Sequence, residues 1–177
     1  LQFTVAGVIT KKNPLRLLGN MLPAYFTALG TASSAATIPV TLAQAKKSGA
    51  SDGVASFVVP LCATIHLSGS TLKIVSCALA LILMQGGAYD LGLFTHFILL
   101  LGVTMVAAPG VPGGAIMAAL AILQSILGFT VEEQALMISL YITMDSFGTA
   151  CNVTGDGAIA LVVDKLLGHK VQGSATA

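Results

Sequence analysis

The sequence predicts an all-α integral membrane protein, in which two re-entrant helical hairpins and two long, internally broken transmembrane helices form an inverted repeat. Three observations lead to this fold class. The 177 residues are 55% hydrophobic and only 8% charged, whereas soluble domains carry about 25% charged residues. Long stretches carry no charged side chain at all. Clusters of proline, glycine and serine interrupt these stretches. So few charges cannot cover a surface that faces water, and we expect much of the surface to face lipid.

Charge and cysteine content exclude two other classes of protein. The formal net charge is +1 and no basic stripe runs along the chain, so we expect no nucleic-acid partner. The cysteines, Cys62, Cys77 and Cys151, are scattered within apolar runs and show neither a disulfide framework nor a metal-binding spacing. We expect them to be small buried residues.

The first ten residues read as the end of a preceding transmembrane helix. Their sequence, LQFTVAGVIT, is too short to span a bilayer and lacks the anatomy of a signal peptide. We therefore expect the chain to be the C-terminal part of a larger protein, with an N-terminal scaffold ahead of it.

Two segments have the pattern of a hairpin whose tip lies inside the membrane. Residues 13–47 consist of an apolar arm, a small polar tip, TASSAATIP, and a shorter arm. Residues 91–130 carry no charge, and the sequence APGVPGG breaks them in the middle. One helix needs only about 20 residues to cross the bilayer core. Irregular backbone at that depth is tolerated only where it lines a protein cavity, so we expect both tips to line one.

Each hairpin is followed by a long hydrophobic segment that contains a polar interruption. The first segment, residues 51–88, is interrupted by TIHLSGST. The second, residues 131–168, is interrupted by MDSFGTACNVTGDGAIALVVD at residues 144–164, and residues 169–177 follow as a tail. The chain therefore reads as hairpin, broken helix, hairpin, broken helix.

The charges beside the two hairpins differ in sign. Cations flank the first hairpin: Lys11, Lys12, Arg16, Lys46 and Lys47. Acids flank the second hairpin: Asp90, Glu132 and Glu133. Because positive residues favour the cytoplasm, we expect the first hairpin to enter from the cytoplasm and the second from outside. Inverted repeats whose broken elements meet at the midplane are typical of secondary transporters.

A polar stripe follows one face of the last segment. Asp145, Thr149, Asn152 and Asp156 are spaced i, i+4, i+7 and i+11, so they share a helix face. A charge at the bilayer centre costs at least ~2.5–3.5 kcal/mol. Two such acids need a partner, which is a substrate ammonium, a metal cation or a proton. The alternative is a structural polar seam between helices, with nearby glycines that allow close packing.

The tips and the first interruption offer complementary chemistry. A helix N-terminus at a broken tip exposes unpaired N–H groups that attract anions. Such groups are expected at Ser33, Ser34 and Thr37 in one tip, and at Gly110, Val111, Gly113 and Gly114 in the other. The stretch TIHLSGST can unwind and offer oxygens to a hard cation such as Na⁺.

These motifs together resemble the dicarboxylate/amino acid:cation symporter family, which has the glutamate-transporter-like fold. The likeness covers essentially the whole chain, from TASSAATIPVT through an NMDGT-like break and a GVPGG tip to D…NVTGD. It implies the C-terminal half of a transport domain that moves like an elevator, with the second hairpin as the outer gate. It also implies a multi-pass plasma-membrane symporter, not an enzyme, with Na⁺ or H⁺ as coupling ion and a trimer formed by the scaffold.

The resemblance also implies roles for individual residues. The substrate-binding residues would be Ser33, Ser34, Ser70, Val111, Gly113, Asp145, Gly148, Thr149 and Asn152, with Asp145 on the amino group. The cation-binding residues would be Asp156 with carbonyls near Cys62, His66 and Asn152 at one sodium site, and Thr64, Leu67 and the backbone before Gly110 at a second.

Two departures from the family pattern affect the expected substrate and ions. Members that carry acidic amino acids have an arginine where this sequence has Gly148, so we infer a neutral substrate such as a small polar amino acid or cystine. An acidic amino acid or dicarboxylate is the alternative. The NMDGT-like motif has His66 and Ser68 at its asparagine and aspartate positions, which puts one sodium site in doubt. Lys73 either snorkels or pairs with an acid, or else Lys73 or His66 carries a coupling proton.

Two other classes of function fit less of the chain. Asp90 and Asp156 could form the acid pair of an intramembrane aspartyl protease. However, Val153 stands where that class has glycine, and Asp90 falls at a predicted helix end. A cation channel is the third class, and proline-broken tips suit occlusion better than a continuous pore.

Overall fold

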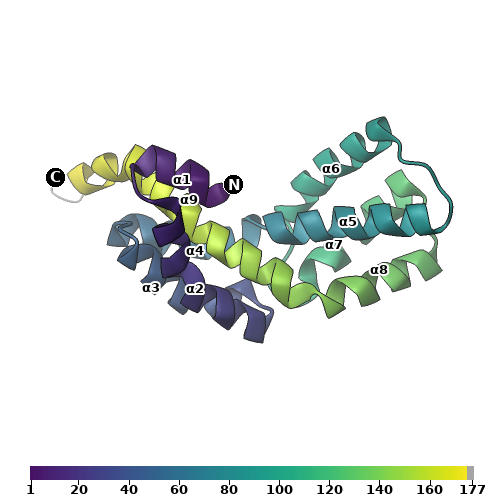
Figure 1. Ribbon diagram of the computed structural model, residues 1–177, viewed down its shortest axis with the longest axis horizontal. Coiled ribbons are helices and arrows are strands. Elements are labelled where there is room, and N and C mark those ends of the chain that lie inside the picture. The colour runs from purple at the N-terminus through teal and green to yellow at the C-terminus, as the bar shows by residue number, and fades with distance from the viewer. Residues whose placement is uncertain (175–177) are drawn as a thin grey trace.

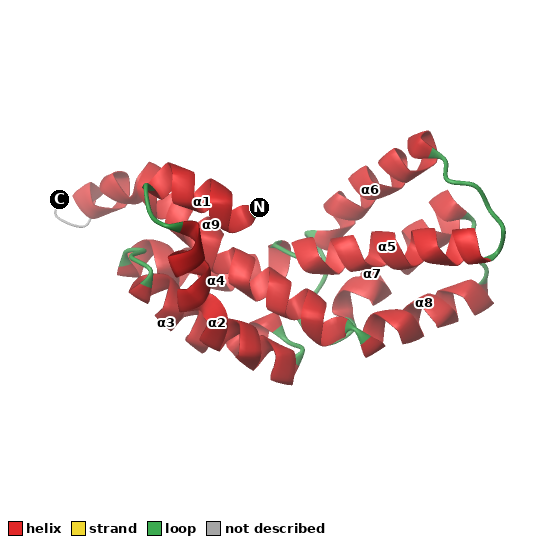
Figure 2. Cartoon of the chain, viewed as in Figure 1, coloured by secondary structure: helices red, strands yellow, loops and turns green. Residues whose placement is uncertain are grey.

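The computed structural model describes residues 1–174, with side chains described through residue 167, and these residues form helices and short loops without a strand (Figures 1 and 2). The helices are α1 (Gln2–Thr10), α2 (Pro14–Thr31), α3 (Ser34–Lys47), α4 (Asp52–Ile65), α5 (Ser68–Met84), α6 (Leu91–Met105), α7 (Gly114–Leu127), α8 (Val131–Thr143) and α9 (Asp145–Ser174). The expected all-α class is confirmed. The last three residues of the expected tail, 175–177, lie outside the described residues.

Both segments expected to form hairpins consist of two helices that pack against each other, α2 with α3 and α6 with α7. The turn between α2 and α3 is tight because Ala32 adopts a left-handed conformation, with φ 47°, and Ser33 caps α3. Gly113 is the residue just before α7 and has φ 74°, a conformation that glycine adopts without steric cost. Re-entry of these pairs into a membrane and their inverted repeat remain predictions.

The first long segment is broken as expected, although over fewer residues. Only His66 and Leu67 separate α4 from α5, so most of TIHLSGST is helical. Taken as one unit, Asp52–Met84 is the stretch of the described chain that is long and apolar enough to cross a membrane.

The second long segment also contains a break, and that break is a single residue long. Only Met144 lies between α8 and α9, and α9 continues without interruption from Asp145 to Ser174. The stretch 144–164 is therefore helical almost throughout, as the helical spacing of its polar stripe predicted. The start of α8 is well capped. The Oγ of Thr130 accepts a hydrogen bond from the backbone N–H of Glu133, and the Glu133 carboxylate accepts one from the backbone N–H of Thr130.

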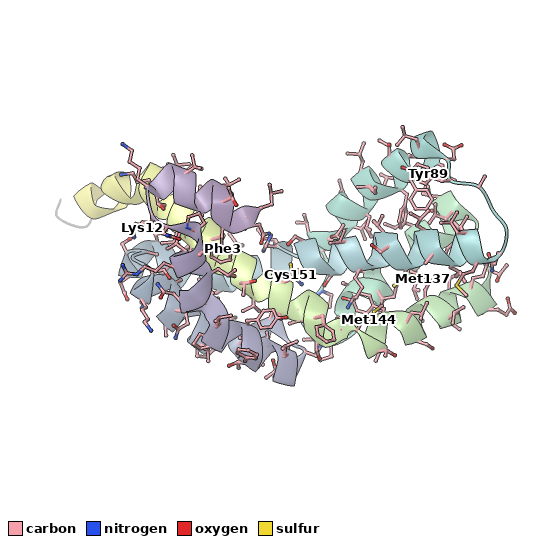
Figure 3. All side chains as sticks on the ribbon, in the orientation of Figure 1. Phe3, Lys12, Tyr89, Met137, Met144 and Cys151 are labelled. Carbon is pink, nitrogen blue, oxygen red and sulfur yellow. The ribbon has the colours of Figure 1, made fainter. Side chains whose placement is uncertain are left out.

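Helix α9 is the common element of the fold. It contacts α1, α2, α3, α4, α5 and α8. In Figure 1 the helices α5–α8 gather at one end, and α9 extends from them into the group formed by α1–α4. One hydrophobic cluster joins α5–α8, and two others join α1–α4 to α9. Large apolar side chains are also exposed over most helices, among them Phe57 and Val103. Tyr89, labelled in Figure 3, is an exposed aromatic residue in a loop.

Candidate functional site

The breaks between helices converge on the polar face of α9 and enclose a small cavity. Eight residues predicted from the sequence line it: Ser34, Leu67, Ser70, Gly110, Val111, Asp145, Thr149 and Asn152. Its volume is about 10 Å³, which is at the lower limit for a single water molecule. The site is therefore closed in this conformation, and a larger ligand can enter only if a loop moves.

Asp145 is the acid at the edge of this cavity, and it is almost fully buried. Its Oδ2 accepts a hydrogen bond of 2.8 Å from the backbone N–H of Gly113, in the loop between α6 and α7. Its Oδ1 pairs at 3.0 Å with the ammonium of Lys73 on α5. The Asp145 carboxylate on α9 therefore contacts both the loop between α6 and α7 and helix α5.

Lys73 pairs with an acid and does not snorkel. Its side chain is only 8% exposed. The ammonium lies 3.4 Å from the ring centre of Tyr141 and donates a 3.3 Å hydrogen bond to the carbonyl of Met144. Tyr141 also lines the small cavity. The sequence analysis missed Tyr141, and its position one helical turn before Asp145 was the signal that could have found it.

Both the oxygen and the nitrogen of the Asn152 side-chain amide form hydrogen bonds within the protein. Helix α5 has no side-chain cap of its own. The Oδ1 of Asn152 accepts hydrogen bonds from the backbone N–H groups of Gly69 at 2.8 Å and Ser70 at 3.4 Å, while its Nδ2 donates to Ser70 Oγ at 3.0 Å. Asn152 therefore supplies, from α9, the cap that α5 lacks.

The two hairpin loops are bonded to each other. The carbonyl of Gly110 accepts hydrogen bonds from Ser33 Oγ at 3.1 Å and from the backbone N–H of Ala35 at 3.2 Å. Ser33 Oγ also accepts from the N–H of Ala36, which caps α3. Ser33 and Gly113 do not line the cavity, but both hold it closed. Gly148 does not line it either and lies against Lys73.

The second acid of the stripe, Asp156, is paired with histidine. His66 Nδ1 lies 2.8 Å from Asp156 Oδ1. The amide nitrogen of Gln2, on α1, lies 2.9 Å from His66 Nε2 and donates to Ser68 Oγ at 3.0 Å. With this amide as donor, the proton of a neutral imidazole lies on Nδ1 and is donated to Asp156. Nothing in the sequence pattern identified Gln2.

The other predicted cation-binding residues are arranged less tightly. Cys62 is buried in α4, whereas Thr64 is exposed and donates to the carbonyl of Leu61. The described residues hold no group of three or more histidine, cysteine or acidic residues arranged to bind a metal ion. A cation at Asp156 would therefore depend on backbone carbonyl oxygens, which are suitable ligands for hard cations.

The acids of the alternative protease reading have separate partners. Asp90 lies in an exposed loop, and its carboxylate accepts a 2.9 Å hydrogen bond from the N–H of Leu93 as the cap of α6. Asp156 is buried and pairs with His66. Among the described residues, no hydrogen bond links Asp90 with Asp156.

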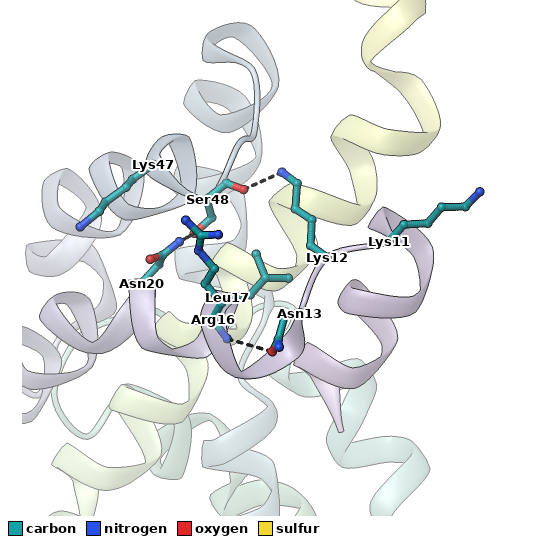
Figure 4. A pocket seen from close by; sticks show the side chains of 8 residues that line it. All are labelled: Lys11, Lys12, Asn13, Arg16, Leu17, Asn20, Lys47 and Ser48. Atoms are coloured by element: carbon teal, nitrogen blue, oxygen red, sulfur yellow. Dashed lines mark hydrogen bonds between the residues drawn. The ribbon is translucent and has the colours of Figure 1, made fainter.

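A second cavity lies at the other end of α2 (Figure 4). Its volume is about 410 Å³, and its lining contains four cations: Lys11, Lys12, Arg16 and Lys47. Lys12 crosses it and donates a 2.7 Å hydrogen bond to the carbonyl of Ser48. With a rise of 1.5 Å per residue, α2 places these cations about 27 Å from the hairpin loop.

Comparison with known proteins gives the family. Residues 1–166 match the sodium:dicarboxylate symporter family. Human excitatory amino acid transporter 2 is 33% identical over 157 residues, which cover 88% of this chain and 27% of that protein. Excitatory amino acid transporter 1 of Ambystoma tigrinum is 33% identical, covering 93% and 30% respectively. Excitatory amino acid transporter 4 of Mus musculus is 30% identical, covering 90% and 28%. The chain thus spans less than a third of the length of these relatives.

Proposed function

Because the chain belongs to the sodium:dicarboxylate symporter family, we propose that it forms the substrate- and ion-binding part of a secondary active amino-acid symporter. One observation carries this proposal: a buried acid, Asp145, faces a closed cavity that both hairpin loops and both helix breaks surround. A symporter needs such a site, which can hold a polar solute away from both aqueous phases and which opens when a loop moves.

In this proposal Asp145 binds the substrate ammonium, assisted by Thr149. The substrate's α-carboxylate binds backbone N–H groups of the loops near Ser33–Ser34 and Val111–Gly113, where helices α3 and α7 begin. The hydrogen bond from Gly113 to Asp145 breaks when substrate enters, so the second hairpin acts as the gate. Ser70 and Asn152 keep the start of α5 in place beneath the substrate.

The coupling site is centred on Asp156. Either Na⁺ binds this carboxylate together with carbonyls near Cys62, His66 and Asn152, or a proton on His66 supplies the positive charge. The close pairing of His66 with Asp156 favours a proton as coupling ion. The family's name favours sodium. A second sodium site would use Leu67, Thr64 and the backbone before Gly110.

Two substrate classes have support. Gly148 stands where family members that carry acidic amino acids have an arginine. The absence of that arginine favours a neutral amino acid such as serine, alanine or cystine. The relatives are named excitatory amino acid transporters, and the ammonium of Lys73 lies beside Gly148, which favours an acidic amino acid.

The arrangement in the membrane is also part of the proposal. The two hairpins re-enter the membrane from opposite sides in an inverted repeat, within a partial transport domain that moves as an elevator. The cations of the cavity in Figure 4 lie on the cytoplasmic side. A scaffold elsewhere in the full-length protein makes a homotrimer in the plasma membrane.

Uptake into proteoliposomes that contain the full-length protein tests the function. Serine, alanine, cystine and aspartate are offered under imposed Na⁺ or proton gradients, with Asp145→Asn as the variant. Gradient-driven uptake that the variant loses is the expected result. Absence of gradient-driven uptake of every amino acid contradicts the proposal.

A further inference from the structure

The cavity in Figure 4 gathers positive charge without an acid to balance it. Of the described residues that line it, four are cations, Lys11, Lys12, Arg16 and Lys47, and none is an acid. Lys11 and Lys47 lie on opposite sides of the cavity, with Lys12 and Arg16 between them (Figure 4). None of the four takes part in an ion pair among the described residues. We refer to it as the cationic cavity.

The acids on the neighbouring helices are bound to other groups. Asp52, at the start of α4, forms an ion pair with Lys46. Asp164, on α9, accepts hydrogen bonds from the backbone N–H and the hydroxyl of Ser51. These carboxylates therefore leave the charge of the cationic cavity unneutralised.

Two of the four cations have a role within the protein, and two do not. Lys12 donates a 2.7 Å hydrogen bond to the carbonyl of Ser48, and Lys47 lies in the last turn of α3, where a cation favours the helix dipole. The side chains of Lys11 and Arg16 are exposed and form no hydrogen bond among the described residues.

The position of Arg16 on its helix is unfavourable for a cation. Arg16 lies in the first turn of α2, and Lys11 lies just ahead of that helix. The N-terminal end of a helix is the positive end of its dipole, so it attracts anions and disfavours cations. A cation in this place is stabilised when an anion binds between it and the helix end. The arrangement therefore indicates an anionic ligand.

The size and surroundings of the cationic cavity suit a lipid headgroup. Its volume of about 410 Å³ lies within the range of about 300–1,000 Å³ that is typical of small-molecule sites. Exposed apolar side chains adjoin the cations: Val8, three residues before Lys11, is 73% exposed, and Leu15, next to Arg16, is 77% exposed. An anion held by these cations would thus lie beside a surface suited to acyl chains.

We propose that the cationic cavity binds the phosphate headgroup of an anionic phospholipid, with the acyl chains against Val8 and Leu15. The planar guanidinium of Arg16 suits paired hydrogen bonds to phosphate oxygens, and Lys11 and Lys47 add charge from two sides. The bound lipid joins the loop between α1 and α2 to the end of α3. Only the cytoplasmic placement of these cations is taken from the proposed function, because anionic lipids are concentrated in that leaflet.

Titration calorimetry with dioctanoyl phosphatidic acid, using the purified full-length protein in a non-ionic detergent, tests this site. Phosphatidic acid should bind, whereas dioctanoyl phosphatidylcholine, which has no net charge, should not. The double variant Arg16→Gln/Lys47→Gln should raise the Kd for phosphatidic acid about 30-fold. The matched control is Lys46→Gln/Lys165→Gln, which loses the same charge from side chains that do not line the cavity. It should change the Kd little, and equal Kd values for the two double variants overturn the proposal.

Two measurements on the unaltered protein do not depend on how the variants fold. Its melting temperature should be higher in nanodiscs of phosphatidylcholine with phosphatidic acid than in phosphatidylcholine alone. Glycerol 3-phosphate and inorganic phosphate, which lack acyl chains, should bind at least about tenfold more weakly than phosphatidic acid. Equal binding of glycerol 3-phosphate would mean that the ligand is a soluble phosphate and would overturn the lipid assignment. Absence of binding of phosphatidic acid overturns the site itself, and amino-acid uptake is unaffected by either outcome.

Discussion

His66 Nδ1 lies 2.8 Å from Asp156 Oδ1, so the imidazole at the break between α4 and α5 directly neutralises or hydrogen-bonds the buried acid of α9. Gln2 contacts the opposite nitrogen of the ring. Its amide can present either its nitrogen or, after a flip, its oxygen, so it suits both the neutral and the protonated imidazole.

The His66–Asp156 pair predicts how the driving ion depends on these side chains. His66→Gln cannot take up a proton, so uptake driven by a pH gradient should fall at least about tenfold, while any uptake driven by Na⁺ should survive. Asp156→Asn should abolish both, because it removes the negative charge that either cation needs. Initial rates under separate Na⁺ and pH gradients measure this. Proton-driven uptake that is unaffected in His66→Gln would exclude His66 as the proton carrier.

Asn152 should be more important for stability than for substrate contact. Asn152→Ala leaves the N–H groups of Gly69 and Ser70 buried and unpaired, which costs about 1–3 kcal/mol. We expect a clear fall in the melting temperature of the purified protein. Asn20→Ala is the matched control, because Asn20 makes one 3.2 Å hydrogen bond to Ser48 near the surface. Equal effects of the two substitutions would contradict the capping role.

Ser33 should control the opening of the second hairpin. Ser33→Ala removes the hydrogen bond to the carbonyl of Gly110 and also the cap of α3, which is worth about 1 kcal/mol. The loop at residues 106–113 should then exchange its amide hydrogens faster, as mass spectrometry can follow. Ser34→Ala is the control, because Ser34 lines the cavity without a side-chain hydrogen bond to that loop. Unchanged exchange in Ser33→Ala would mean that the bond from Ala35 suffices.

Gly69 should tolerate no side chain. A Cβ there would lie 2.5 Å from the carbonyl oxygen of Gly148 and 2.6 Å from the Cβ of Cys151, so α5 and α9 would have to separate. Gly69→Ala should destabilise the protein by about 1–3 kcal/mol and lower uptake. Gly102→Ala is the comparison, because a Cβ at that helical glycine meets nothing within 4 Å. It should be neutral or stabilising by up to about 1 kcal/mol. The melting temperatures of the two purified variants test this prediction. A Gly69→Ala protein as stable as the unaltered protein would show that α5 and α9 can move apart to admit a methyl group.

The helix boundaries were predicted well where the signal is local. The proline and glycine residues of APGVPGG and the polar tip TASSAATIP end helices through their own backbone chemistry, and the structure has breaks at both places. The polar stretch at residues 144–164 stays helical after Met144, and its glycines allow contact between helices. At Gly155, for example, a Cβ would collide with the side chains of His66 and Gln2. Sequence alone does not separate a glycine that breaks a helix from one that admits a neighbour.

The sequence predicted which residues of α9 lie at the candidate site, but not which side chains of other helices pair with them. The spacing of the stripe correctly placed Asp145, Thr149, Asn152 and Asp156 on one buried face. The partners of these residues come from other helices, such as Lys73 on α5 and Gln2 on α1. Those pairings depend on how the helices cross, and periodicity within one helix carries no information about crossing. The functional roles of the predicted residues stay predictions.

The central position of α9 has a consequence for how the protein is made. Among the described helices α9 is the last to be synthesised, yet α1–α5 all pack against it. Helices that leave the ribosome earlier therefore wait with incomplete interfaces, with Lys73 lacking its acid and the start of α5 lacking its cap, until α9 arrives. Chaperones and quality-control proteases that sample exposed polar groups inside the membrane have that interval in which to act. Substitutions on α9 should accordingly reduce the amount of protein that reaches its membrane before they alter what it carries.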